Sequence, residues 1–132
     1  MFITTNTLNR MRVFSNPAYA REAIETLYRV QELHPFFLYE FVIMPDHCHF
    51  LVKVPESGSV SKIMNVYKLG VAHNIGMGPI WQSRFHMILP EDPKFIRAYI
   101  QQNPVKAGLV EFADEYSWSS ASGKWDTEEW LE

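Results

Sequence analysis

The sequence contains a single cysteine, Cys48, and no long apolar run. One cysteine excludes an intramolecular disulfide framework and any metal site built on a CxxC pair, and it is typical of a reducing compartment. The first residues contain no unbroken apolar stretch of signal-peptide length, and no segment approaches the about 18 consecutive apolar residues of a transmembrane helix. We therefore expect a cytoplasmic protein that has no membrane partner.

The chain also lacks an excess of positive charge. Its 132 residues include 12 lysines and arginines against 15 aspartates and glutamates, a net charge of −3, which excludes a histone-like or arginine-rich nucleic-acid binder. Residues 1–110 hold 11 basic and 8 acidic residues, whereas residues 111–132 hold one basic and seven acidic residues. We predict a single domain over residues 1–132, with a core of about residues 1–110 and an acidic, aromatic C-terminal tail over 111–132.

Hydrophobic residues make up 47% of the chain and aromatic residues 14%, which is enough for a folded core. The last predicted helix should end near Asn103, because Pro104 disfavours helical geometry in the residue before it. The resulting order, β-α-β-β-α-β-α, indicates an α+β fold in which helices pack on an antiparallel β-sheet. The predicted strands span 1–8, 36–44, 47–54 and 80–89. The predicted helices span 18–31, a stretch capped by Ser59 or Ser61 that runs to about Ile75, and 93–102.

Two histidines flank the cysteine on one predicted strand, directly after a Pro-Asp turn. Side chains two residues apart on a strand lie on the same face, so His47 and His49 could bind one divalent cation together. Taken alone, this interpretation and that of two polar residues on a solvated strand face are equally supported. The position within an apolar hairpin favours the metal site, because a pair of imidazoles is costly there unless it is used.

A second signal lies in the last predicted helix. Tyr99 and Asn103 are four residues apart and therefore share one helix face. A tyrosine on an amphipathic helix usually belongs to the core, and an asparagine before a proline usually ends a helix. The spacing by itself therefore favours core packing over chemistry.

Three separated blocks, FVIMPDHCHFLVKVPE, IWQSRFHMILPED and IRAYIQQNPVKAGLVEFADEYSWSSA, together resemble the single-tyrosine HUH transposases. The hallmark of that family is His-hydrophobic-His on a strand, followed by a nucleophilic tyrosine on a later helix. The blocks YI-x-x-NP-V-[KR]-AG-L-V and Y-x-WSS place the chain closest to the REP-associated branch. The resemblance extends from the first strand to about Ala121, and it implies an HUH-endonuclease fold with a ferredoxin-like core.

The resemblance also implies roles for individual residues. His47 and His49 would bind the metal ion, and Asn103 would be the third protein ligand, with Gln102 as the second choice. Tyr99 would be the nucleophile. The expected cofactor is Mg²⁺ or Mn²⁺, which a mixed nitrogen and oxygen ligand set with open positions suits.

The implied activity is that of a transposase: a metal-dependent single-stranded DNA endonuclease and strand transferase acting on hairpin-bearing DNA. Tyr99 would attack phosphorus, giving a covalent 5′-phosphotyrosine and a free 3′-hydroxyl. Because the bond energy stays in the protein–DNA link, rejoining needs no ATP. The phenol must lose its proton during attack, and Lys106 and His86 are candidate bases on residue type alone.

The expected partner is single-stranded or hairpin DNA, whose recognition needs cationic groups in a groove. We expect about half of the basic candidates to be ordinary solvated charges. The candidate phosphate contacts are Arg10, Arg12, Lys53, Lys62, Arg84, Arg97 and Lys106.

Two alternatives stay open. A domesticated family member would bind hairpin DNA without mobility, and a non-catalytic module would use His47 and His49 to hold a structural ion. A homodimer and a monomer are both compatible with the sequence. The acidic tail would either rest on a basic groove and compete with DNA or keep the protein soluble, and we rank solubility first.

Overall fold

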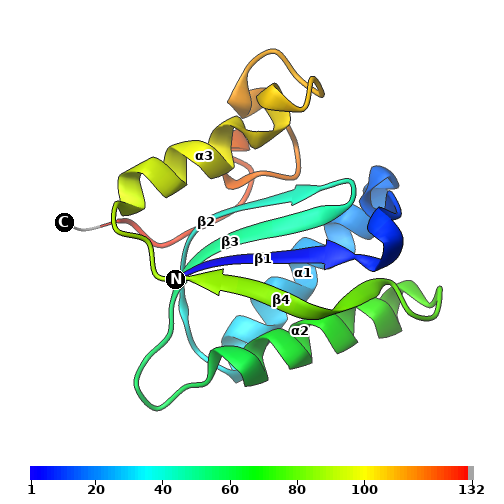
Figure 1. Ribbon diagram of the computed structural model, residues 1–132, viewed down its shortest axis with the longest axis vertical. Helices are drawn as coiled ribbons and strands as arrows, with labels where there is room; N and C mark the ends of the chain where they lie inside the picture. The colour runs from blue at the N-terminus through cyan, green and yellow to red at the C-terminus, as the bar shows by residue number, and fades with distance from the viewer. Residues whose placement is uncertain (131–132) are drawn as a thin grey trace.

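The protein, described by a computed structural model over residues 1–130, has a four-stranded antiparallel sheet between two layers of helix (Figure 1). The strand order is β2-β3-β1-β4. This arrangement of β1-α1-β2-β3-α2-β4 is ferredoxin-like, and the predicted α+β fold is confirmed. The strands are β1 (Phe2–Thr7), β2 (Phe37–Met44), β3 (His47–Lys53) and β4 (Trp81–Ile88), the α-helices are α1 (Pro17–Leu33), α2 (Val60–Ile75) and α3 (Pro93–Lys106), and short 3₁₀ turns span Leu8–Arg10, Val13–Ser15, Ala113–Glu115 and Ser120–Ser122.

Side-chain caps define where α1 and α2 begin. The Asn16 side chain accepts a hydrogen bond from the backbone N–H of Ala18 at 2.9 Å, and Ser59 Oγ accepts one from the N–H of Lys62 at 3.3 Å. α2 ends at Gly76, whose φ of 75° lies in the left-handed region that glycine adopts without a steric penalty. The chain therefore enters and leaves these helices at defined points and returns to the sheet.

The sheet separates two hydrophobic clusters, one on each face. Successive β3 side chains point to opposite faces, so Cys48 and Phe50 are buried against α1 and α2, whereas Leu51 is buried toward α3. The cluster on the α3 side also contains Ile96 and Ile100 of that helix. The predicted alternation along β3 is confirmed, and it puts both histidines on the α3 side.

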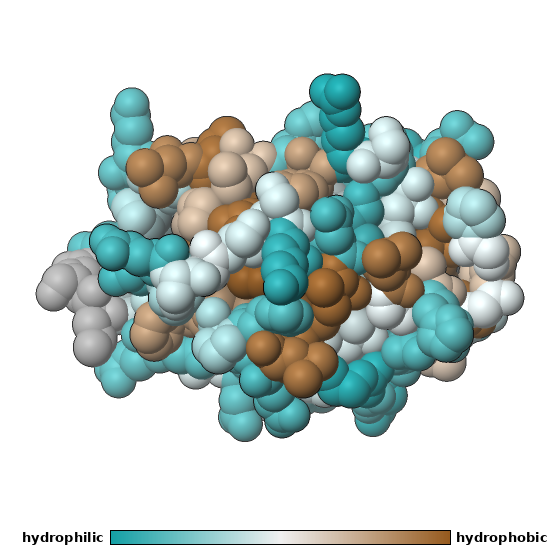
Figure 2. Space-filling view, turned by 90° about the horizontal axis from the view of Figure 1, so that it is seen from below, coloured by the Kyte–Doolittle hydropathy of each residue, from teal (hydrophilic) through white to brown (hydrophobic). Residues whose placement is uncertain are grey.

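Helices α1 and α2 cover the face of the sheet that points away from α3. Figure 2, seen from below the view of Figure 1, shows hydrophilic and apolar side chains interspersed on this face. Exposed apolar residues of these helices include Leu33 and Leu69, each 72% exposed. Within residues 1–130, no helix combines the length and the apolar run needed to cross a membrane.

α3 extends to Lys106 and passes through Pro104, so the predicted helix end near Asn103 is wrong. Pro104 lacks the N–H for a helical hydrogen bond, but the next turn continues, with the Ala107 N–H donating to the Asn103 carbonyl at 3.0 Å. Pro104 is itself buried, so apolar contact offsets the missing bond. Asn103 therefore lies inside the helix, one turn after Tyr99.

The acidic segment that follows α3 runs along the outer edge of β2. The Ile43 N–H donates to the Trp118 carbonyl at 2.8 Å, and the Glu128 N–H donates to the Leu38 carbonyl at 2.8 Å. These bonds satisfy backbone groups that an edge strand would otherwise expose. The part of the predicted 111–132 tail that the structure describes is thus attached to β2; its last two residues lie outside the described range.

Candidate metal and nucleophile site

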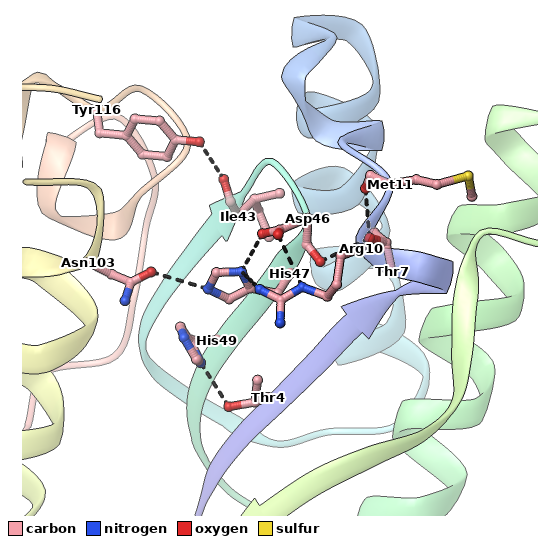
Figure 3. Close-up of polar contacts among 10 residues, drawn as sticks. All are labelled: Thr4, Thr7, Arg10, Met11, Ile43, Asp46, His47, His49, Asn103 and Tyr116. Carbon is pink, nitrogen blue, oxygen red and sulfur yellow. Dashed lines mark hydrogen bonds and ion pairs between the residues drawn. The ribbon is translucent and has the colours of Figure 1, made fainter. Parts of the chain in front are cut away.

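The start of β3 and the second half of α3 bring the four predicted site residues together. Figure 3 shows three of them, His47, His49 and Asn103. Nε2 of His47 lies 3.2 Å from Oδ1 of Asn103. The centroids of the two imidazole rings are 4.7 Å apart, and the Tyr99 ring centroid lies 5.6 Å from that of His49. Residues from two segments about fifty positions apart therefore share one small region above the sheet.

Hydrogen bonds at Nδ1 determine how both imidazoles point. Thr4 Oγ1 lies 2.8 Å from Nδ1 of His49, and Asp46 Oδ1 lies 2.7 Å from Nδ1 of His47. The carboxylate can only accept, so Nδ1 of His47 donates to it. This leaves the Nε2 lone pair of His47 directed toward Asn103, which is the orientation of a metal-ligating histidine.

Arg10 lies beside both Asp46 and His47. Its Nε is 3.1 Å from Oδ2 of Asp46, and its terminal nitrogen is 3.4 Å from Nδ1 of His47. Asn9 and Arg10 have φ values of 53° and 54°, a left-handed turn that is uncommon outside glycine. Burial alone would raise the pKa of Asp46, but its hydrogen bonds with His47 and Arg10 outweigh burial and lower that pKa below its ordinary value. Asp46 is therefore held as the carboxylate that orients His47.

His49 is the more deeply placed imidazole, with only 5% of its surface exposed. The Phe2 ring lies 5.1 Å from it, centroid to centroid. Burial, together with the nearby His47 and Arg10, lowers the pKa of His49 from 6.5 to about 3. His49 is consequently neutral at ordinary pH, which is the state that a metal-ligating histidine requires.

The oxygen atom nearest to His47 Nε2 belongs to the side-chain amide of Asn103. Within residues 1–130, no three His, Cys, Asp or Glu side chains gather into a group that could hold a metal ion. A cation between these residues would depend on the two histidines and on the Oδ1 atom of Asn103. Gln102, the second choice for the third ligand, is exposed on α3, whereas Asn103 is partly buried and faces His47.

Comparison of the sequence with known protein families shows which family the chain belongs to. A family model described as "Transposase IS200 like" matches residues 2–103. The chain belongs to the IS200-like transposase family. Within that family, it is 31% identical over 125 residues to the REP-associated tyrosine transposase of Escherichia coli (strain K12), and the match covers 90% of this chain and 74% of that protein.

Solved structures agree with the family assignment. The structure of the REP-associated tyrosine transposase bound to a REP hairpin matches with a TM-score of 0.79 at 27% identity, over 95% of this chain and 81% of that one. A chain from Deinococcus radiodurans, at 18% identity, shares the fold with a TM-score of 0.61, over 80% of this chain and 87% of its own. The predicted resemblance to the REP-associated transposases and the HUH fold that it implies are confirmed.

The two candidate bases lie in different places. Lys106 is exposed on the last turn of α3, and its Nζ lies 5.6 Å from the centroid of the Tyr99 ring. His86 is exposed on β4 opposite Thr4, so it shares the face of the sheet on which His49 lies. Lys106 is therefore the candidate in contact range of the tyrosine ring.

The seven predicted phosphate contacts do not form one cluster. Arg10 and Lys106 lie beside the histidines and the tyrosine. Arg97 Nε lies 3.3 Å from Oε1 of Glu40, so its guanidinium is held by an ion pair. Lys62 lies on α2, across the sheet from α3. The remaining three are exposed: Arg12 before the 3₁₀ turn at Val13–Ser15, Lys53 at the end of β3 and Arg84 on β4.

Sequence reasoning missed the residues that support the site. Asp46 directly precedes His47 and could have been considered as its hydrogen-bond partner. Thr4 had no such signal, because its contact with His49 depends on the pairing of β1 with β3. The ion pair of Glu40 with Arg97 depends equally on where α3 crosses β2.

Proposed function

We propose that this chain is a metal-dependent single-stranded DNA endonuclease and strand transferase that acts on hairpin-bearing DNA through a covalent 5′-phosphotyrosine at Tyr99. Membership in the IS200-like transposase family supports a DNA-processing enzyme. The observation that carries the finer proposal is the 3.2 Å approach of His47 Nε2 to Asn103 Oδ1 beside the Tyr99 ring. The cytoplasmic location and the oligomeric state stay predictions.

The donor set fits a divalent ion. With Nδ1 of His47 donating to Asp46, Nε2 of His47 and Oδ1 of Asn103 are two acceptors facing each other. Adjacent ligands of an octahedral Mg²⁺, each about 2.1 Å from the ion, lie about 3 Å apart, so this spacing suits two ligands of one cation. His49 would be the third ligand. When bound, Mg²⁺ or Mn²⁺ would polarise the scissile phosphate and offset its charge.

Tyr99 would supply the nucleophile. Its phenolic oxygen would form the new bond to phosphorus, and the 3′-oxygen of the preceding nucleotide would leave and take up a proton, giving a free 3′-hydroxyl. The phenolic proton would pass to solvent water, and the ammonium of Lys106, 5.6 Å from the centre of the Tyr99 ring, would stabilise the phenolate that forms. Arg10, which pairs with Asp46 beside His47, would contact a neighbouring phosphate.

Hairpin DNA is the partner that the comparisons support. The structure matched at a TM-score of 0.79 is that of a REP-associated tyrosine transposase bound to a REP hairpin. With a net charge of −3, the protein would gain little affinity for DNA from its overall charge. Recognition would therefore depend on the shape of the DNA and on a few specific contacts.

A cleavage assay with a 3′-labelled hairpin oligonucleotide and Mn²⁺, read on a denaturing gel that retains phosphotyrosine adducts, tests this function, because the 5′-phosphotyrosine keeps the fragment that carries the 3′ end. Tyr99→Phe should abolish the adduct and leave the fold intact, since the phenylalanine ring keeps the contacts with Phe2 and His49. His47→Ala should remove activity together with the dependence on divalent metal. An undiminished adduct in Tyr99→Phe would refute the assignment of the nucleophile.

A further inference from the structure

α3 presents three different sets of side chains along its length. Ile96, Ile100 and Pro104 form the buried stripe that faces the sheet. Tyr99 and Asn103 lie on one side of that stripe, toward the histidines of β3. On the other side, four residues apart, lie Arg97 and Gln101.

Arg97 and Gln101 both bind a single buried carboxylate, Glu40 of β2. Glu40 is only 4% exposed. Its Oε1 accepts from Arg97 Nε at 3.3 Å and from Gln101 Nε2 at 2.9 Å. Its Oε2 accepts from the hydroxyl of Ser120, whose own Oγ accepts from the Phe41 N–H at 2.9 Å. The carboxylate is thus bound by α3 and by the C-terminal segment at once.

This arrangement explains the YSWSS sequence that follows α3. The Tyr116 hydroxyl donates to the Ile43 carbonyl at 2.7 Å, and the Trp118 carbonyl accepts from the Ile43 N–H. These two bonds hold the segment against β2 and carry Ser120 to Glu40. The motif therefore completes the hydrogen bonds of a buried charge, which would be costly to leave unpaired.

The buried stripe alone does not determine how α3 is rolled about its axis, because apolar contact is non-directional. Side-chain groups lie about 5–6 Å from a helix axis, so a roll of about 10° shifts them by about 1 Å. A misplacement of about 1 Å at a reacting group can lower a rate about 100-fold. Directional hydrogen bonds on the Arg97 side of the stripe oppose such a roll.

We propose that Glu40 is a positioning residue: with Arg97, Gln101 and Ser120 it holds the roll of α3 and so places Tyr99 and Asn103 over His47 and His49. This inference rests on the proposed function for its effect on rate. Its structural part, the anchoring of α3 by Glu40, stands on the contacts alone. Glu40 contacts α3 and the C-terminal segment, and it is given no contact with substrate or metal.

The test compares Glu40→Gln with Glu22→Gln. Glu22 is a matched control, because its carboxylate is also bound by an arginine, an amide and a hydroxyl, from Arg29, Asn74 and Thr26, but on the α1 and α2 side of the sheet. The measurements are the rate of adduct formation at saturating labelled hairpin in Mn²⁺, the dissociation constant of the hairpin, and amide hydrogen exchange across α3.

Glu40→Gln should lower the rate of adduct formation about 10- to 100-fold, change the hairpin dissociation constant less than twofold, and speed exchange in α3. Glu22→Gln should leave the rate and the exchange of α3 unchanged. Ser120→Ala leaves the Glu40 carboxylate paired with Arg97 and should lower the rate of adduct formation less, about three- to tenfold. It replaces Glu40→Gln in the test if Glu40→Gln does not fold.

Three results would overturn the inference: a folded Glu40→Gln that reacts within twofold of the wild-type rate, an equal loss of rate in Glu22→Gln, or unchanged exchange in α3. A wild-type protein that forms no adduct would overturn the proposed function and the effect on rate with it. The exchange measurement would then support or overturn the anchoring of α3 by itself.

Discussion

Asp46 allows the orientation of His47, a proposed metal ligand, to be tested without any DNA chemistry. Asp46→Ala removes the acceptor that lies 2.7 Å from Nδ1 of His47 and the carboxylate that pairs with Arg10 at 3.1 Å. The imidazole then loses its fixed tautomer and rotation. The Arg10 guanidinium, 3.4 Å from His47, also loses its counter-charge and would repel a cation at the ring.

Loss of such an orienting partner typically weakens metal binding 10- to 100-fold, and we expect a loss of this size in Asp46→Ala. That range corresponds to about 1.4–2.7 kcal/mol of binding free energy. Asp46→Asn keeps an acceptor oxygen and should lose less. Adding Arg10→Ala to Asp46→Ala should recover part of the affinity, because the uncompensated positive charge is then gone.

The assay is a titration of the protein with Mn²⁺, following free Mn²⁺ by electron paramagnetic resonance in the absence of DNA. Asp126→Ala is the control, since it deletes an exposed aspartate of the C-terminal segment. Thermal melts should show that each variant is folded. An Mn²⁺ affinity for folded Asp46→Ala within twofold of wild type would refute the argument that Asp46 orients His47.

Two predictions concern the core under α1 and α2. Phe50→Ala should cost about 3–5 kcal/mol of unfolding free energy in urea, because the ring is 1% exposed and packs 5.3 Å from that of Tyr67, centroid to centroid; a loss below 1 kcal/mol would contradict this packing. Cys48 is fully buried and burial raises the pKa of its thiol, so Ellman's reagent at pH 8 should react only after unfolding, whereas rapid reaction of the native protein would place Cys48 at the surface.

The local sequence pattern was enough to predict the strands and helices and to predict that His47 and His49 share one face of a strand. The period of two along β3 assigns Cys48 and Phe50 to one face and His47 and His49 to the other, and the structure confirms that alternation. The same local reasoning was wrong at Pro104, where the helix continues to Lys106. The preference of the residue before a proline for extended geometry is a small energy, and burial of Pro104 outweighs it.

The sequence was a weaker guide to which basic residues contact phosphate, for a different reason. Arg97 is a candidate phosphate contact by residue type, but it pairs with Glu40 of β2. The positions are 57 apart in the sequence, and nothing in either neighbourhood indicates the pair. Whether a charged side chain meets a phosphate or another side chain depends on which strand a helix crosses.

The sequence by itself determined the order of the elements, the face of each β3 side chain and, through its three motif blocks, the transposase family. These depend on periodicity and on short stretches of residues, which local backbone geometry imposes. Only the tertiary structure decided that Asn103 faces His47, that Thr4 binds His49, and that the segment carrying Ser120 meets Glu40. Those contacts join residues 45 or more positions apart, and they form because β1 pairs with β3 and because α3 packs across β2.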